Sequence, residues 1–192
     1  MSAVTPGKVV VLTAPSGAGK TTIAKKLLNE LSWLRFSVSA TTRAPRAHEV
    51  HGRDYYFLSN ETFDSYIEEG QFLEWEEFYK GTRYGTLRSS VEEKLQNGFF
   101  VLFDVEVKGA VSLKNVYGAH CLSLFIKPPD LQTLRSRLLS RGTESEKTLQ
   151  TRMQRAEMEL QQAQKFDHVI TNDDFETAYA RVRSLLERFK HA

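Results

Sequence analysis

Cysteine is almost absent from this chain, with one residue, Cys121, among 192. A single cysteine excludes an internal disulfide and a metal cluster built on cysteines. It stands in the apolar stretch 120–126, where we expect a small buried side chain. The sequence also lacks any apolar run of membrane-spanning length, and residues 1–7 lack the apolar centre of a secretory signal. These absences predict a cytoplasmic protein that makes no contact with a membrane.

An excess of charge of either sign is missing as well. The 26 lysines and arginines nearly balance the 24 aspartates and glutamates, which leaves a net charge of +2. A nucleic-acid-binding protein usually concentrates basic residues on one face, and here the charges are intermixed, so nucleic acid is not an expected partner. With 41% hydrophobic residues, the composition fits one globular core that carries smaller inserted lobes.

A glycine-rich segment directly follows the apolar run 9–13. Small side chains allow successive backbone N–H groups to surround phosphate oxygens, and a helix that opens at Gly19 adds its own N–H groups. Lys20 would place a positive charge at the terminal phosphates, while the Thr21 hydroxyl can bind Mg²⁺. The usual pattern begins with glycine, and Ala14 at that position meets the same need for a small residue. The alternative is a glycine-rich turn that binds no ligand. Because the segment lies between a predicted strand and a predicted helix, that alternative is disfavoured. The loop residues predicted to bind a nucleoside triphosphate are Ala14, Pro15, Ser16, Gly17, Ala18, Gly19, Lys20 and Thr21.

Apolar runs alternate with helical patterns along much of the chain. The runs 9–13, 99–105, 120–126 and 168–171 are typical of strands buried on both faces of a parallel sheet. Helical patterns occupy residues 20–31, 87–96, 108–117, 130–140 and 175–190. The alternation predicts an α/β core with a parallel sheet, as in proteins that bind nucleotides through a phosphate loop.

Two stretches interrupt this alternation. Residues 35–90 are polar, aromatic and rich in turns, with short strands expected at 55–58 and 72–75, and Thr62 can cap a helix that reaches Gly70. Residues 139–164 contain a long polar helix with little apolar periodicity, which fits a cover over an active site. We therefore predict one domain over about residues 5–190. It consists of a core of residues 1–36 and 88–192, which includes a helical lid of about 139–164, and an inserted α+β lobe of residues 37–87.

Residues 42–46 combine two arginines with a proline. Pro45 keeps Ala44 out of helical geometry, so Arg43 and Arg46 lie on a shaped loop where their guanidinium groups could grip one phosphate. Taken alone, the pair would better be interpreted as solvated surface arginines. The neighbouring segments change that interpretation. Residues 36–46, 52–57, 72–75, 84–86, 141–144 and 170–174, together with the phosphate loop, resemble the guanylate kinase family in each block and in the spacing between blocks.

The resemblance covers nearly the whole chain and implies phosphoryl transfer from ATP to GMP, with Mg²⁺ and with ADP and GDP as products. It also implies a core, a GMP-binding lobe and a lid, in agreement with the two interruptions. The GMP contacts that it implies are Arg43, Arg46, Tyr55 and Tyr84 to the phosphate, Ser39, Glu74 and Thr86 to the base and nucleotide, and Asp104 and Glu106 from one strand end. Thr86 stands where serine is common, and Glu106 stands where many relatives have aspartate.

Catalysis requires little covalent chemistry, because the attacking GMP phosphate oxygen is already ionised at neutral pH. Alignment and positive charge lower the barrier, and the implied catalytic residues are Lys20 with the lid arginines Arg141 and Arg152. Asn172 is expected to bind ATP near the adenine. Closure of the lid and the lobe would exclude water. Three glycines are candidate hinges: Gly52, Gly81 and Gly142. Arg137 and Arg155 are expected only to solvate helices. Lys108 is assigned no role.

Glu74 is the residue expected to select guanine. Guanine presents the N1–H and the N2 amino group side by side, and one carboxylate can accept from both. Adenine has an unprotonated N1, which would leave polar groups unmatched. The alternative for Glu74 is a solvent-facing acid on a strand, next to Glu76 and Glu77.

Two other functions remain open from the sequence. A kinase for AMP, UMP or dTMP is one, which Glu74 and Thr86 disfavour. A non-catalytic module of the same family that binds phosphorylated peptides is the other, and Lys20, Thr21 and the lid arginines disfavour it. The sequence does not distinguish a monomer from a homodimer, or GMP from dGMP as a second acceptor.

Overall fold

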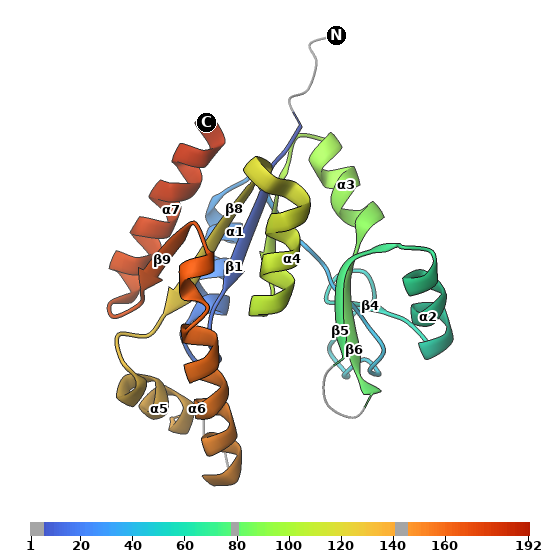
Figure 1. Cartoon of the computed structure of the whole chain (residues 1–192). Helices are drawn as coiled ribbons and strands as arrows, with labels where there is room; N and C mark the ends of the chain where they lie inside the picture. Colours follow the sequence, from blue (N-terminus) through green and yellow to red (C-terminus); the bar gives the residue numbers. More distant parts are fainter. Residues whose placement is uncertain (1–5, 78–80, 141–145) are drawn as a thin grey trace.

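The computed structural model describes residues 6–77, 81–140 and 146–192, which form two sheets and the helices around them (Figure 1). The larger sheet has five strands in the order β2-β7-β1-β8-β9, and every pairing in it is parallel. Its strands are β1 (Val9–Thr13), β2 (Leu34–Phe36), β7 (Phe100–Asp104), β8 (Cys121–Lys127) and β9 (His168–Thr171). The predicted α/β core with a parallel sheet is therefore confirmed.

Helices cover both faces of the larger sheet. Side chains alternate along β1, so Val10 and Leu12 pack in the apolar cluster with α1 and α7, while Val9 and Val11 pack on the other face with α3 and α4. These helices are α1 (Lys20–Glu30), α3 (Arg88–Gln96), α4 (Val107–Tyr117) and α7 (Phe175–His191). Short 3-10 helices span Gly118–His120 and Ala163–Lys165. None of the helices in the described part of the chain is long and apolar enough to cross a membrane.

The two edge strands differ from expectation. The inner strands β1, β7 and β8 are buried nearly throughout, whereas β9 has only β8 beside it. His168 and Val169 are half-buried and Thr171 is exposed, so the expectation that this run is buried on both faces is wrong. Strand β2 was not expected, because its three residues mix a half-buried arginine with an exposed phenylalanine and form no apolar run.

The smaller sheet lies within residues 40–87 and has the order β4-β3-β6-β5. Its strands are β3 (Ala40–Thr41), β4 (Tyr56–Phe57), β5 (Phe72–Glu77) and β6 (Arg83–Leu87), with α2 (Asn60–Glu68) beside them. Phe63 of α2 stacks on Phe72 of β5, with ring centroids 4.4 Å apart, and these two rings form the centre of a separate apolar cluster. The expectation that Thr62 caps α2 is wrong. Ser59 is the N-cap, because it is extended and its hydroxyl accepts from the backbone N–H of Thr62 at 3.1 Å.

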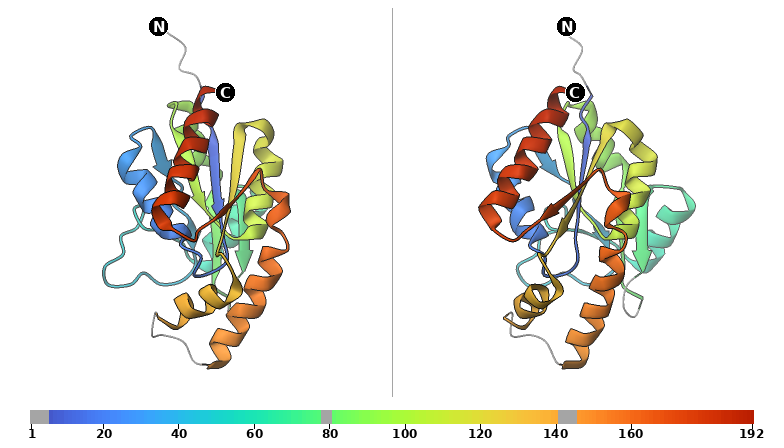
Figure 2. Two further views of the ribbon diagram at one scale, coloured as in Figure 1. Left: turned by 90° about the vertical axis from the view of Figure 1, so that its left-hand side faces the viewer. Right: turned by 60° about the vertical axis from the view of Figure 1, so that its left-hand side comes forward.

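Helices α5 (Leu131–Leu139) and α6 (Glu146–Leu160) pack on each other at the end of the larger sheet that is opposite the C-terminal end of α7 (Figure 2). They share a small apolar cluster that contains Leu134, Leu138, Leu149 and Ala156, with Met153 against it. The expectation of little apolar periodicity in α6 is therefore wrong. The inner face of α6 consists of Leu149, Met153 and Ala156. Long polar residues separate them, so this apolar face is inconspicuous in the sequence.

Candidate functional site

The glycine-rich loop joins β1 to α1, as its position in the sequence predicts. Gly19 is the N-cap of α1 and has a left-handed backbone with φ of 95°. The side-chain amide of Asn172 donates to the carbonyl of Ala18 at 2.7 Å, and a Cβ atom on Gly19 would lie 2.3 Å from that amide nitrogen. Only glycine fits there. Asn172 is buried and braces the loop, while its expected contact with adenine stays a prediction.

Asp104 connects the loop to the neighbouring strand. The parallel register places Asp104 of β7 beside Leu12 of β1, so its carboxylate lies at the edge where the loop begins. Lys20 forms an ion pair with Asp104, and its ammonium also donates to the carbonyl of Val105 at 3.2 Å. The hydroxyl of Thr21 donates to Oδ2 of Asp104 at 3.4 Å. Asp104 was predicted only as a GMP contact. In the structure its carboxylate also contacts Lys20 and Thr21 of the loop.

A cleft of about 290 Å³ lies beside this ion pair. Its volume is near the lower end of the range for small-molecule sites, which suits a single mononucleotide. Six of the nine predicted GMP residues line the cleft together with Lys20: Ser39, Tyr55, Glu74, Tyr84, Asp104 and Glu106. Sequence reasoning did not identify four other lining residues: Glu76, Gly85, Val105 and Gly109. Residues from both sheets therefore meet in one cleft.

Glu74 lines the cleft and forms a polar pair with Thr86, a predicted GMP contact that is buried and does not itself line the cleft. They are partners in the antiparallel register of β5 and β6, and the hydroxyl of Thr86 donates to Oε1 of Glu74 at 2.6 Å. Burial raises the pKa of Glu74 above its ordinary value, and the hydrogen bond from Thr86 opposes that rise. The alternative that Glu74 is a solvated surface acid is not supported, because its carboxylate is desolvated and lines the cleft.

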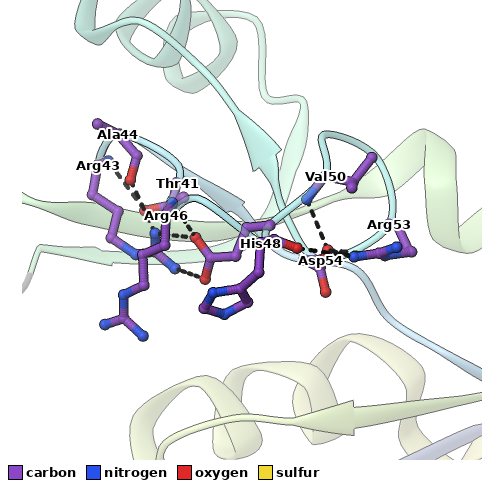
Figure 3. Close-up of polar contacts among 9 residues, drawn as sticks. Thr41, Arg43, Ala44, Arg46, His48, Val50, Arg53 and Asp54 are labelled. Carbon is purple, nitrogen blue, oxygen red and sulfur yellow. Dashed lines mark hydrogen bonds and ion pairs between the residues drawn. The ribbon is translucent and has the colours of Figure 1, made fainter.

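The arginine loop contains an ion pair that was not expected (Figure 3). Nη1 and Nη2 of Arg43 each donate at 2.6 Å to one oxygen of Glu49, and the backbone N–H of Arg46 donates to the same carboxylate at 2.8 Å. These bonds, with that of Arg43 first, lower the pKa of Glu49 to about 2. Arg43 also stacks over the ring of Tyr55 at 4.8 Å and bonds to Tyr84. The sequence did contain a signal for this ion pair: Glu49 lies only three residues after Arg46, in the same turn as the two arginines.

The two arginines of this loop differ in their surroundings. The guanidinium of Arg43 is held on several sides, and its side chain is 18% exposed. Arg46 is exposed, and Figure 3 shows its guanidinium directed away from the pair formed by Arg43. Within residues 6–77, 81–140 and 146–192, the Arg46 guanidinium has no hydrogen bond or ion pair. Neither arginine lines the cleft itself, but Tyr55 and Tyr84, which contact Arg43, do.

Residues from α5 and α6 reach the same region. Arg152 lies half-buried on α6, whereas Arg141 and Gly142 fall outside the described residues. Two arginines expected only to solvate helices have specific partners, so that expectation is wrong. Nη2 of Arg137 donates to the carbonyl of Asn172 at 3.0 Å. Nη2 of Arg155 lies 3.0 Å from Oε2 of Glu106, and its Nε bonds to Glu159. The remaining hinge candidates, Gly52 and Gly81, have left-handed backbones with φ of 80° and 78°.

Known proteins resemble this chain over most of its length. A family model described as guanylate kinase matches residues 6–189. The guanylate kinase of Bacteroides fragilis is 47% identical over 182 residues, which cover 95% of this chain and 89% of that protein. The guanylate kinase of Salinibacter ruber is 48% identical over 181 residues, which cover 94% and 96%. The crystal structure of guanylate kinase from Anaplasma phagocytophilum matches with a TM-score of 0.77 at 30% identity, over 98% of this chain and 88% of that one.

Proposed function

Because the chain belongs to the guanylate kinase family, we propose that the cleft between its two sheets binds GMP and that the glycine-rich loop binds ATP. The enzyme phosphorylates GMP with ATP and yields GDP and ADP. One observation supports this assignment of the two sites most directly. Lys20 opens the helix behind the loop and also lines the cleft that contains Glu74. Its ammonium can therefore approach the phosphates of both nucleotides.

The base of GMP would bind at the Glu74 and Thr86 pair. The carboxylate of Glu74 can accept from N1–H and the N2 amino group of guanine, while the hydroxyl of Thr86 donates to Oε1 of Glu74 and would hold the carboxylate in place. Ser39, Asp104 and Glu106 line the same cleft and would complete the contacts to the nucleotide. A buried polar mismatch costs about 1–3 kcal/mol per group, so this pair would disfavour adenine strongly.

The phosphate of GMP would bind at the other end of the cleft, where Tyr55 and Tyr84 adjoin Arg43. Glu49 fixes the guanidinium of Arg43 in one orientation, which reduces the conformational entropy lost on binding. Arg46, exposed on the same loop, would swing in as the second arginine. Two guanidinium groups and two phenols then supply donors to a dianionic phosphate.

The ATP phosphates would lie in the loop from Ala14 to Thr21, against the backbone N–H groups at the start of α1. Asn172 would keep the loop in shape through its bond to Ala18. The oxygens of Thr21 and Asp104 lie 3.4 Å apart beside this loop, and Mg²⁺ prefers oxygen ligands. We propose that these two residues hold the metal, which when bound neutralises charge on the ATP phosphates.

Catalysis would then depend on position and charge. Lys20 lies between the two sites and stabilises negative charge on the transferring group, and Arg141 and Arg152 add to it when the lid closes. Residues 37–87 act as the GMP lobe and about 139–164 as the lid of the core, and their closure excludes water. A reaction on ATP and GMP fits the cytoplasmic location that the composition predicts.

A comparison of two variants tests this proposal. Lys20→Ala should abolish turnover in a coupled assay of ADP release, while calorimetry still detects GMP binding. Glu74→Gln should weaken the preference for GMP over AMP, because the amide presents a donor toward N1–H. Comparable turnover of GMP, AMP, UMP and dTMP by the unaltered protein would contradict the assignment of Glu74. Retained turnover in Lys20→Ala would contradict the assignment of the loop.

A further inference from the structure

We propose that Gly109 is a positioning residue for the carboxylate that selects guanine. Gly109 lies in the first turn of α4 and in the wall of the cleft, opposite Glu74 of β5. A Cβ atom on Gly109 would lie 3.0 Å from Oε2 of Glu74 and 3.5 Å from its Cδ. The absence of that one carbon atom lets the carboxylate lie directly against the helix. This inference rests on the proposed role of Glu74 in binding guanine.

The helix itself does not require glycine at this position. Gly109 is not among the glycines with a positive φ, so its backbone conformation is open to alanine. Alanine is the better helix former, and the next nearest neighbour of the added atom, Cβ of Val105, is 3.6 Å away, an ordinary contact. The close approach of Glu74 is therefore the feature that a side chain at position 109 would disturb.

The carboxylate of Glu74 is held from two sides. Its Oε1 accepts from Thr86 at 2.6 Å, and its Oε2 faces Gly109. A Cβ atom at position 109 would force Oε2 to retreat by a few tenths of an ångström, because ordinary contacts begin near 3.4 Å. The end of a glutamate side chain can move that far at little cost to folding. Its hydrogen bonds to Thr86 and to guanine depend on direction and would weaken.

The position of α4 adds an electrostatic reason for close approach. Burial disfavours the ionised form of Glu74, while the first turn of a helix carries unpaired N–H groups and partial positive charge that favour a nearby anion. The effect decreases steeply beyond the first turn. Gly109 thus lets the guanine-binding carboxylate lie where the helix supports its charge.

The test compares Gly109→Ala with a control on the same helix. Ser112→Ala lies on the exposed side of α4 and gains helix propensity without approaching Glu74. We expect Gly109→Ala to lower kcat/KM for GMP by about 5- to 30-fold, the factor given by a weakened hydrogen bond to a charged group. The loss should appear in KM for GMP, with kcat and KM for ATP nearly unchanged. The preference for GMP over IMP, which lacks the N2 amino group, should fall in parallel. Ser112→Ala should change none of these.

A double variant separates positioning from other effects. In the Glu74→Gln background the charged acceptor is already lost, so adding Gly109→Ala should change kcat/KM by less than about twofold. An equal fold loss in both backgrounds, or an unchanged KM for GMP in Gly109→Ala, would overturn the proposal. So would a Gly109→Ala protein that fails to fold, because the strain would then fall on the fold. If Glu74→Gln itself leaves the GMP to IMP preference unchanged, the assigned role of Glu74 is wrong. A silent Gly109→Ala beside an impaired Glu74→Gln refutes only the role of Gly109.

Discussion

The hydrogen bond from Thr86 to Glu74 offers the sharpest test of how the enzyme binds guanine. Thr86 is 1% exposed, and its hydroxyl donates to Glu74 at 2.6 Å. Valine has nearly the same shape without the hydroxyl, so Thr86→Val removes this bond with little change in packing. A hydrogen bond to a charged group contributes about 1.5–3 kcal/mol, which corresponds to about 10- to 150-fold in affinity. We therefore expect KM for GMP to rise by that factor, while KM for ATP stays unchanged.

The same variant should shift the pH dependence of GMP binding. Burial already raises the pKa of Glu74 above its ordinary value of 4.5, and the bond from Thr86 limits the rise. The unfolded chain has the ordinary value, so ionised Glu74 costs stability at neutral pH, and that cost disappears as pH falls through the raised pKa. In the proposed binding mode guanine needs the ionised form, so binding should weaken on acidification. In Thr86→Val the pKa rises further, and binding should be lost at a higher pH.

Steady-state kinetics would measure KM for GMP, and calorimetric titration with GMP between about pH 5 and 8 would measure the pH dependence of binding, since that interval lies above the ordinary pKa of a glutamate. Thr86→Ser is the matched control, because it keeps the hydroxyl and should retain nearly normal affinity and pH dependence. A Thr86→Val protein with unaltered KM and an unaltered acidic limb would refute the argument that this hydroxyl supports Glu74.

Three further outcomes follow from other contacts. Glu49→Gln should raise KM for GMP several-fold, because Arg43 loses its charged partner. The pKa of Glu49 is about 2, so in the unaltered enzyme this carboxylate should not affect the pH dependence of KM for GMP above about pH 4. Asn172→Ala should raise KM for ATP with little effect on KM for GMP, because the hydrogen bond that braces the glycine-rich loop is lost. Steady-state kinetics would show this. Ser123→Ala should lower the free energy of unfolding by about 1–3 kcal/mol in urea denaturation, because it leaves the carboxylate of Asp167 without the hydroxyl donor at 2.6 Å; unchanged stability would contradict this.

The parts of the fold that depend on local patterns could be predicted from the sequence. The phosphate loop lies between β1 and α1 because an apolar run, small residues and an amphipathic helix follow one another within residues 9–30. The short strands β3 and β6 escaped notice for the opposite reason. Ala40 pairs with Gly85 and Thr41 with Tyr84 across more than forty residues, and neither segment contains an apolar run of its own.

The candidate site divides in the same way. The residue types at the cleft followed from the resemblance to the guanylate kinase family, which implied contacts from Glu74, Tyr55 and Tyr84. Their partners did not, because a partner depends on side-chain direction and distance in space. The bond of Arg155 to Glu106 joins α6 to the start of α4, and nothing in either segment alone indicates it.

By itself, the amino-acid sequence determined the α/β class and the glycine-rich loop between a strand and a helix, because periodicity and short motifs are properties of neighbouring residues. The chemistry expected at the cleft came from the resemblance to the guanylate kinase family. The tertiary structure decided which charges are already paired, as Arg43 is with Glu49, and how closely α4 approaches Glu74 at Gly109. Such distances arise only when segments far apart in the chain pack together. In the proposed binding mode, differences of a few tenths of an ångström there would decide how well the carboxylate of Glu74 binds guanine.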